Sequence, residues 1–373
     1  MATTILVTGS LGYIGSVLTG YLQDHEFTCV GYDTGFYRGC TLYPPREGST
    51  VLRDMRDFRE EDLDGVDAVV HLAGMSNDPV GSVPPAHMYD PTRAYSARLA
   101  ALCKARGIQL IFASSCSVYG IAHEQFVTET SATAPQTPYS LNKLQIEQDL
   151  QTMSDGTFTP IILRFATVFG LSPRMRFDIV INMFVGMALT TGRIVLNSNG
   201  QAWRPHIHIE DVCRIIRWCI ESPPHASDAM ILNMGDTQQN FRVLDVAEMV
   251  RAKVPGCEVV LLNRQPPQMP REDLSLIRDS KIHDGVDTRT YKVSFELMKQ
   301  ALPGFRCRWT VEQGIETILQ QLRELGLTEA QFRDPKFYRL QTLDALVRRG
   351  ILTDEFTWTR SPAPCPAPAR EGS

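Results

Sequence analysis

A glycine-rich turn between an apolar run and a helical stretch constrains this chain more than any other feature. Residues 4–8 are apolar or β-branched, residues 8–15 read Thr-Gly-Ser-Leu-Gly-Tyr-Ile-Gly, and residues 16–22 have helical periodicity. Glycines at this spacing permit a tight turn, a close approach of the backbone to a pyrophosphate and close packing of the helix, whose first amides face the phosphates. The pattern predicts a dinucleotide-binding turn with cofactor contacts from Gly9, Gly12, Tyr13, Ile14 and Gly15.

A carboxylate at the end of the second predicted strand indicates which dinucleotide is bound. Residues 27–33 read Phe-Thr-Cys-Val-Gly-Tyr-Asp, so Asp33 lies about twenty residues beyond the glycines. A carboxylate there accepts hydrogen bonds from the adenosine ribose hydroxyls and repels a 2′-phosphate. We therefore predict NAD as the cofactor, while Arg38 nearby keeps NADP open as an alternative.

Strands and helices continue to alternate after this unit. Strands are expected at residues 50–53, 67–74, 108–113 and 159–165, with a helix at 88–106. This order predicts the α/β class, with a Rossmann-type doubly wound parallel sheet whose ligands bind at the carboxyl ends of its strands. His71 within the fourth strand is interpreted as a core histidine satisfied by backbone groups. Further cofactor contacts are expected from Asp54, Met55, Leu72, Ala73 and Gly74.

Tyr139 and Lys143 are the candidate proton shuttle. A spacing of four on a helix places the phenol and the ammonium on one face, where the positive charge is expected to lower the pKa of the tyrosine. Ser115 lies at the end of the preceding strand, in the stretch Ser-Ser-Cys-Ser-Val-Tyr-Gly of residues 114–120, and can place a second hydroxyl beside the same substrate oxygen.

Composition excludes several other classes of protein. The chain has 373 residues, a formal net charge of -5 and no stripe rich in lysine and arginine, which argues against a nucleic-acid partner. No apolar run approaches the ~20 residues of a membrane span, and the first residues lack a targeting pattern, so a cytoplasmic protein is expected. The nine cysteines are scattered, without the spacing of a disulfide framework or a metal site.

Four motifs in order resemble the extended short-chain dehydrogenases/reductases, specifically the nucleotide-sugar epimerase/dehydratase family. They are the glycine turn at residues 8–15, the serine-rich strand end at 114–120, Tyr-x-x-x-Lys at 139–143 and the strand at 163–170, and the resemblance covers about residues 3–320. It implies that Ser115 is the catalytic hydroxyl and Tyr139 the acid/base. Lys143 would bind the nicotinamide ribose and lower the pKa of Tyr139.

The resemblance also implies where a nucleotide-diphosphate sugar binds. Residues 204–212 resemble a family segment whose arginine holds the substrate diphosphate, and residues 287–291 resemble a second such segment. The substrate contacts expected from it are Ser115, Ser117, Thr167, Asn182, Arg204 and Arg289. Dehydratases and decarboxylases of the family carry an acid just after the catalytic hydroxyl, whereas this chain has Cys116 and Ser117 there. Cys116 is interpreted as a buried thiol.

The expected organisation is a nucleotide-binding domain followed by a smaller lobe. We assign residues 1–172 to the NAD-binding domain, with returning segments near 205–233, and residues 173–325 mainly to a nucleotide-sugar-binding α/β lobe. Residues 326–359 are predicted to form a helical appendage, called here the C-terminal appendage, and residues 360–373 a disordered tail. By resemblance, a homodimer is expected, with the helices at 88–106 and 140–153 at its interface.

These observations predict an NAD-dependent epimerase of a nucleotide-diphosphate sugar. It would act by transient oxidation, most simply at C4, and re-reduction with tightly bound NAD. A reductase of 4-keto nucleotide sugars, exchanging NADPH or NADH at each turnover, is the alternative. A dehydratase lacks its usual acid and base here. A dinucleotide-sensing scaffold would have no need of Ser115, Tyr139 and Lys143.

Overall fold

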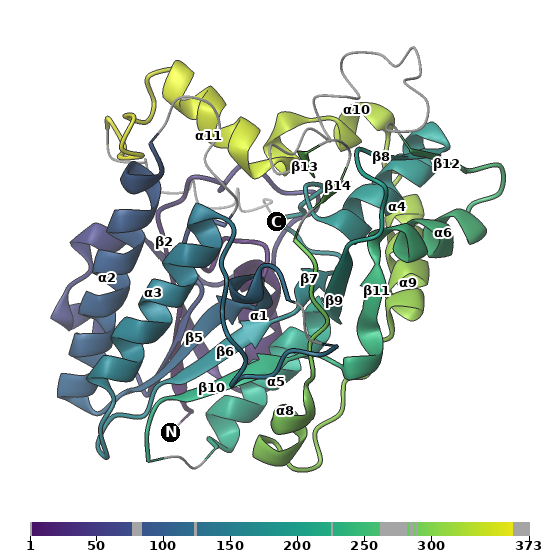
Figure 1. The fold of residues 1–373 in the computed structure, drawn as a ribbon. Coiled ribbons are helices and arrows are strands. Elements are labelled where there is room, and N and C mark those ends of the chain that lie inside the picture. Colours follow the sequence, from purple (N-terminus) through teal and green to yellow (C-terminus); the bar gives the residue numbers. More distant parts are fainter. Residues whose placement is uncertain are drawn as a thin grey trace.

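A parallel sheet of seven strands forms the centre of the protein (Figure 1). The computed structural model describes residues 2–76, 84–122, 125–224, 227–261, 282–283, 286–287 and 289–360. The strand order is β3-β2-β1-β4-β5-β6-β10. From β1 the chain first adds strands toward one edge of the sheet and then, starting with β4, toward the other edge, as in doubly wound sheets. Its strands are β1 (Thr4–Thr8), β2 (Thr28–Asp33), β3 (Ser49–Leu52), β4 (Ala68–His71), β5 (Gln109–Ser115), β6 (Ile161–Phe165) and β10 (Met230–Met234).

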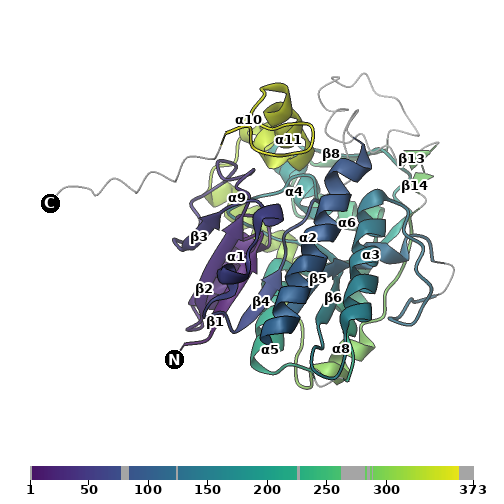
Figure 2. The same cartoon turned by 90° about the vertical axis from the view of Figure 1, so that its left-hand side faces the viewer.

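Helices cover both faces of this sheet, which is why its central strands are mostly apolar, with polar residues such as Thr8, His71 and Ser115 at their carboxyl ends. The helices α2 and α3 pack against each other over one face, and α1 packs with α5 over the other (Figures 1 and 2). The expected helix at 88–106 begins three residues earlier, because Pro85 suits a first helical position. These helices are α1 (Gly15–Gln23), α2 (Pro85–Arg106), α3 (Pro138–Met153) and α5 (Ile209–Glu221), with short helical turns η1 (Met55–Asp57), η2 (Glu60–Leu63) and η3 (Cys116–Tyr119).

A smaller lobe stands beside the carboxyl ends of the strands and has its own apolar core. Its sheets are β11-β9-β7 and β12-β8, together with the pair β13-β14. The helix α9 (Val311–Glu324) buries its apolar face in this core, whereas α8 (Glu296–Ala301) packs against β10 of the central sheet. The elements of the smaller lobe are β7 (Thr167–Phe169), α4 (Val180–Thr191), β8 (Arg193–Leu196), β9 (Trp203–His208), η4 (Thr237–Gln239), β11 (Asn240–Arg242), α6 (Val243–Ala252), β12 (Glu258–Leu261), β13 (Ile282–His283), β14 (Val286–Asp287) and α9 (Val311–Glu324).

The C-terminal appendage lies across both parts of the molecule, at the top in Figures 1 and 2. It contains α10 (Glu329–Phe332), η5 (Pro335–Phe337) and α11 (Arg339–Arg348), followed by turns up to residue 360. Phe332 and Phe337 pack against Phe177 of the smaller lobe, with ring centroids 5.0 and 5.5 Å away. Further along, apolar side chains join a cluster with the other part of the molecule: Leu343, Leu352 and Phe356 with Phe36, Tyr37, Met88 and Tyr89. The predicted disordered tail lies outside the described residues apart from residue 360.

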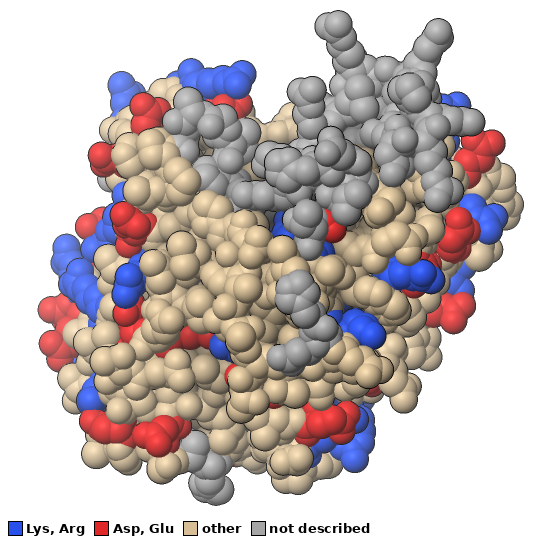
Figure 3. Space-filling view, in the orientation of Figure 1, with Lys and Arg blue, Asp and Glu red and all other residues tan. Residues whose placement is uncertain are grey.

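Surface and composition add three observations. In the part of the chain that the structure describes, no helix is both long and apolar enough to cross a bilayer. Acidic and basic side chains are interspersed around the face in Figure 3, without a broad basic area. The eight cysteines of the described residues are free, and the described side chains offer no His/Cys/Asp/Glu cluster for a metal ion.

Candidate active site

A cavity of about 890 Å³ opens at the carboxyl ends of the strands and is lined by both lobes and by the C-terminal appendage. It brings together the predicted site residues, Asn182 excepted, from segments that are far apart in the sequence. Those lining it are Gly9, Gly12, Tyr13, Ile14, Gly15, Asp33, Asp54, Met55, Leu72, Ala73, Gly74, Ser115, Ser117, Tyr139, Lys143, Thr167, Arg204 and Arg289.

The glycine turn has the shape that a dinucleotide requires. A Cβ on Gly15 would lie 2.2 Å from the Gly9 carbonyl oxygen, and one on Gly9 would lie 2.9 Å from the Ala73 nitrogen, so side chains are sterically excluded from both positions. The Asp33 carboxylate faces this turn and accepts hydrogen bonds from the Leu11 amide at 3.0 Å and the Gly35 amide at 2.8 Å. Because burial raises the pKa of Asp33, additional donors such as ribose hydroxyls would stabilise its charged form. These features fit NAD.

His71 is a core residue, as predicted, although its partners differ from those expected. Its Nδ1 lies 2.7 Å from the Thr8 hydroxyl and its Nε2 lies 2.9 Å from the Ser96 hydroxyl, so side chains rather than backbone groups satisfy it. Burial lowers the pKa of His71 to about 3, which keeps the ring neutral. His71 is the last residue of β4 and is buried in the core, so it is not a candidate base.

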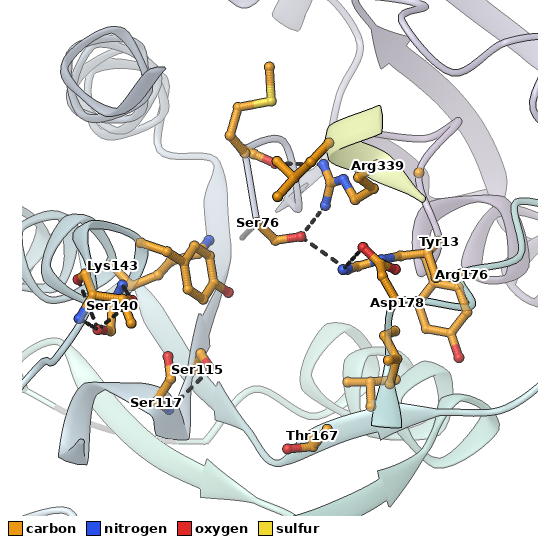
Figure 4. Close-up of a pocket in the computed structure, with 18 of the residues that line it drawn as sticks. Tyr13, Ser76, Ser115, Ser117, Ser140, Lys143, Thr167, Arg176, Asp178 and Arg339 are labelled. Atoms are coloured by element: carbon orange, nitrogen blue, oxygen red, sulfur yellow. Dashed lines mark hydrogen bonds and ion pairs between the residues drawn. The ribbon is translucent and has the colours of Figure 1, made fainter. Parts of the chain in front are cut away.

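Ser115, Tyr139 and Lys143 line the same cavity, with Ser115 in hydrogen-bonding contact with Tyr139. Figure 4 shows Ser115 and Lys143 on the same side of the cavity. Strand β5 ends at Ser115, and α3 begins at Pro138, where the Thr137 hydroxyl caps the first turn by accepting from the Ser140 amide at 3.1 Å. The Lys143 ammonium is buried and donates to the Ala113 carbonyl at 2.7 Å. Burial lowers the pKa of Lys143 to about 8, against the opposing effect of the Glu147 carboxylate.

The pKa of Tyr139 departs from the expectation that Lys143 lowers it. Burial dominates and raises the pKa of the Tyr139 phenol, while Ser115 and two arginines of the cavity, Arg176 and Arg339, act in the opposite direction. The Lys143 ammonium instead serves the Ala113 carbonyl. In the ligand-free protein, Ser115, Arg176 and Arg339 are therefore the groups that favour the phenolate of Tyr139.

A buried ion pair supports the helix that carries Tyr139 and Lys143. Glu147 is fully buried on α3 and binds Arg164 of β6, with its Oε2 2.6 Å from Nη2 of the arginine. The Ser114 hydroxyl also donates to Glu147, and the Tyr119 hydroxyl accepts from Arg164 at 3.0 Å. Because both charges are fully hydrogen-bonded, this pair fixes α3 against β5 and β6.

At the other end of the cavity, Arg204 and Arg289 share one carboxylate. Arg204 Nη2 lies 2.7 Å from Asp287 Oδ2, and Arg289 Nε lies 2.9 Å from Asp287 Oδ1. Arg204 also donates to the backbone carbonyl of Arg289, which joins β9 to the segment after β14. Two guanidinium groups on one carboxylate leave an excess of positive charge, which suits an anionic group of a substrate.

Asn182 and Cys116 are both engaged away from the cavity. The Asn182 amide accepts from the Gly170 amide at 3.1 Å and donates to the Tyr13 hydroxyl at 3.0 Å, so it joins α4 to the glycine turn. Its predicted contact with a sugar nucleotide stays a prediction. Cys116 is buried, its thiol contacts the Arg164 carbonyl at 3.2 Å, and burial raises its pKa, which confirms the buried-thiol interpretation.

Several lining residues were not anticipated. Arg176 is paired with Asp178, their Nε and Oδ1 atoms being 2.8 Å apart, and also donates to the Ser76 hydroxyl at 3.0 Å (Figure 4). The alternating arginines of residues 173–178, after a strand end, were a usable signal for this pair. His206 lines the cavity with both ring nitrogens lacking a partner among the described residues, and burial lowers its pKa to about 3. Arg339 comes from the C-terminal appendage, and no sequence motif marks it as a site residue.

This combination of fold and site defines an NAD(P)-binding enzyme with a serine, tyrosine and lysine at the carboxyl ends of a doubly wound sheet. Residues 5–235 match the model of the NAD dependent epimerase/dehydratase family. The protein belongs to this family, and its cofactor is NAD, which confirms both the resemblance and the predicted cofactor.

Curated relatives include sugar-nucleotide epimerases. The chain is 27% identical over 273 residues to an uncharacterised UDP-glucose epimerase of Bacillus subtilis (strain 168), covering 67% of this chain and 82% of that protein. It is 33% identical over 183 residues to the UDP-glucose 4-epimerase of Azospirillum brasilense, covering 46% of this chain and 51% of that protein.

Solved structures show the same fold with a wider range of names. An NAD-dependent NDP-hexosamine 5,6-dehydratase involved in tunicamycin biosynthesis matches with a TM-score of 0.71 and 24% identity, covering 87% of this chain and 99% of that chain. MoeE5 in complex with UDP-glucose and NAD matches with a TM-score of 0.66 and 25% identity, covering 86% of this chain and 99% of that one. Epimerases and dehydratases thus both occur among the similar proteins.

Proposed function

We propose that this protein is an NAD-dependent epimerase of a nucleotide-diphosphate sugar. The observation that carries the proposal is the convergence of Ser115, Tyr139 and Lys143 on one cavity that also reaches the Arg204–Asp287–Arg289 cluster. The cluster suits the diphosphate of the substrate, and the three residues suit the chemistry at its sugar.

Each residue would have a distinct role. Tyr139, as a phenolate, accepts the proton of a sugar hydroxyl, most simply O4, and returns it later. Ser115 hydrogen-bonds the same oxygen and holds it in position, while Lys143 binds the nicotinamide ribose. NAD, when bound, supplies a reversible hydride acceptor. A keto sugar that turned within the cavity would take the same hydride back on its opposite face, so no exchange of the cofactor would be needed.

The surroundings of Ser115 favour epimerisation over elimination. Cys116 points to the Arg164 carbonyl, and Ser117 offers only a hydroxyl. Three carboxylates of the cavity are paired with arginines: Asp54 with Arg56, Asp178 with Arg176, and Asp287 with Arg204 and Arg289. Asp33 instead accepts from backbone amides beside the glycine turn. An acid and base pair for removing water from the sugar is therefore not assembled next to Ser115 by these residues.

The test is to purify the protein, denature it and identify any released nucleotide by chromatography. The intact protein is then incubated with a panel of nucleotide sugars without added cofactor. We expect about one NAD per chain and formation of an isomer. We expect Tyr139→Phe to keep its NAD and to lose about 10²- to 10⁴-fold in rate, whereas Tyr21→Phe, outside the cavity, should match the wild type.

Other outcomes would replace the proposal. A protein that purifies empty and turns over only a keto sugar with added NADH or NADPH would be a reductase. Formation of a dehydrated keto sugar in the same panel would identify a dehydratase.

A further inference from the structure

Arg339 stands out among the arginines of the cavity because it lacks a carboxylate partner. It begins α11, lines the cavity, and donates to the Gly74 carbonyl at 3.3 Å and to the Ser76 hydroxyl (Figure 4). Its guanidinium also lies 5.1 Å from the centre of the Tyr37 ring. Among the described residues, no acidic group lies within ion-pair distance of it, whereas Arg176, Arg204 and Arg289 each bind an aspartate.

The position of Arg339 corresponds to the middle of a bound dinucleotide. On one side it contacts Tyr37, four residues after Asp33, which marks the adenosine ribose. On the other side it contacts Gly74, where a Cβ would lie 3.9 Å from the Lys143 ammonium that marks the nicotinamide ribose. The charge of Arg339 lowers the pKa of both Asp33 and Lys143, which is consistent with a place between them. A diphosphate joins the two riboses of NAD.

Neighbouring groups increase the positive potential at this place. Arg174 is buried, and its guanidinium lies 4.5 Å from the centre of the Tyr37 ring, which Arg339 also contacts. Its Nε and Nη2 have no hydrogen-bond partner among the described residues. The first turn of α11 lines the cavity as well, and helix N-termini carry partial positive charge. Asp33 and Asp178 attract Arg339 and Arg174 electrostatically, but neither arginine forms an ion pair with them among the described residues. Burying charges without a directly paired group is costly, so an anion bound here would offset part of that cost.

The C-terminal appendage is held on both sides of the cavity. Arg56, next to the predicted cofactor contact Met55, donates to the carbonyls of Glu355 at 3.1 Å and Phe356 at 2.8 Å. Trp358 donates to the Thr34 carbonyl at 2.7 Å, beside Asp33. Since Phe332 and Phe337 are anchored in the smaller lobe, the segment between these anchors crosses the cavity with Arg339 facing into it.

We propose that Arg339 is a cofactor-binding residue that holds the diphosphate of NAD, and that the C-terminal appendage thereby closes over the bound cofactor. The proposal depends on the NAD cofactor and not on which sugar is isomerised. It assigns a role in binding to a segment that lies outside the strand, turn and helix motifs of the sheet.

The test measures NAD binding to cofactor-free protein by titration calorimetry, with no sugar present. We expect Arg339→Gln to raise the Kd for NAD about 10- to 100-fold and Arg339→Lys to restore part of the affinity. The matched control is Arg348→Gln, at the other end of α11, where the side chain is 78% exposed and pairs with Asp344. This control should bind NAD like the wild type.

A second titration identifies the group that Arg339 contacts. ADP-ribose contains the diphosphate and should lose the same factor in Arg339→Gln, whereas adenosine should bind both proteins equally. An unchanged Kd for NAD in Arg339→Gln would overturn the proposal, as would an equal loss of affinity for adenosine. UDP is titrated as well, and a loss of affinity for UDP alone would also overturn it. Absence of isomerase activity would leave the proposal standing, because no step of the test involves a sugar.

Discussion

The ammonium of Lys143 is buried in the ligand-free protein, and this burial has an energetic cost. The pKa of Lys143 falls from 10.5 to about 8 because the charged form is desolvated. A residue whose folded-state pKa is lowered in this way destabilises the fold below pH 8. The penalty disappears as pH rises from about 8 to 10.5, where the folded state has released the proton but the unfolded state has not.

We therefore expect Lys143→Met to stabilise the cofactor-free protein, by an amount on the order of 3 kcal/mol at pH 7. The difference from wild type should shrink at pH 9.5, because wild type then folds with a neutral amine. Urea denaturation of both proteins at the two pH values measures it. A gain that is equal at both pH values would show that the burial of charge is not its cause.

Residue identities predicted this site better than residue environments. Short sequence patterns contain the glycines of the turn, Asp33, Ser115, Tyr139 and Lys143, and the spacing within each pattern determines which residues become neighbours. The pKa of Tyr139 could not be predicted in the same way, because it depends on burial and on charges from segments beyond α3. The hydrogen bond from the Lys143 ammonium to the Ala113 carbonyl could likewise not be predicted from any sequence pattern.

At the scale of elements, the first strand, turn and helix form the most constrained unit of the chain. The Gly9 backbone adopts a positive φ of 74° and packs against the exit of β4, while α1 starts against the same turn. Residues 8–15 specify the turn and the start of α1, which is why these were predictable, whereas the contact of Gly9 with the exit of β4 was not. Its tolerance for side chains is correspondingly small.

We expect Gly15→Ala to disrupt cofactor binding. Its new Cβ would lie 2.2 Å from the Gly9 carbonyl oxygen, a backbone atom that can move only if the turn opens. The variant should purify with little NAD and melt at a lower temperature than wild type. Gly156→Ala is the control, since nothing lies within 4 Å of its Cβ position. Full NAD occupancy in Gly15→Ala would show that the turn can relax.

The C-terminal appendage was predictable as mostly helical but not in its location. Its helical residues end at Arg348, and the remainder forms turns closed by a bridge between Leu352 and Trp358. Contacts such as Tyr37 with Arg339 join residues 302 positions apart. Such contacts depend on packing against surfaces that exist only in the folded protein. The local periodicity of the sequence therefore does not predict them.

At the scale of the whole molecule, the cavity joins three parts, and the C-terminal appendage shares one apolar cluster with each of the other two. A ligand that touches all three stabilises their common arrangement over the unfolded chain. By mass action, NAD at 100 times its Kd should add about 2.7 kcal/mol to the free energy of unfolding. Calorimetry of cofactor-free protein with increasing NAD should show a rising transition temperature, and two transitions of which only one moves would contradict this coupling.

The position of Arg339 so late in the chain also affects how the protein is made. Residues 4–74 complete the cofactor turn and its first strands early in translation, whereas Arg339 follows Gly74 by roughly 265 residues, or on the order of tens of seconds of synthesis. During that interval the glycine turn has been synthesised, whereas α11, whose first turn lines the cavity, has not. We therefore expect NAD to have access to the nascent protein before α11 emerges to cover it.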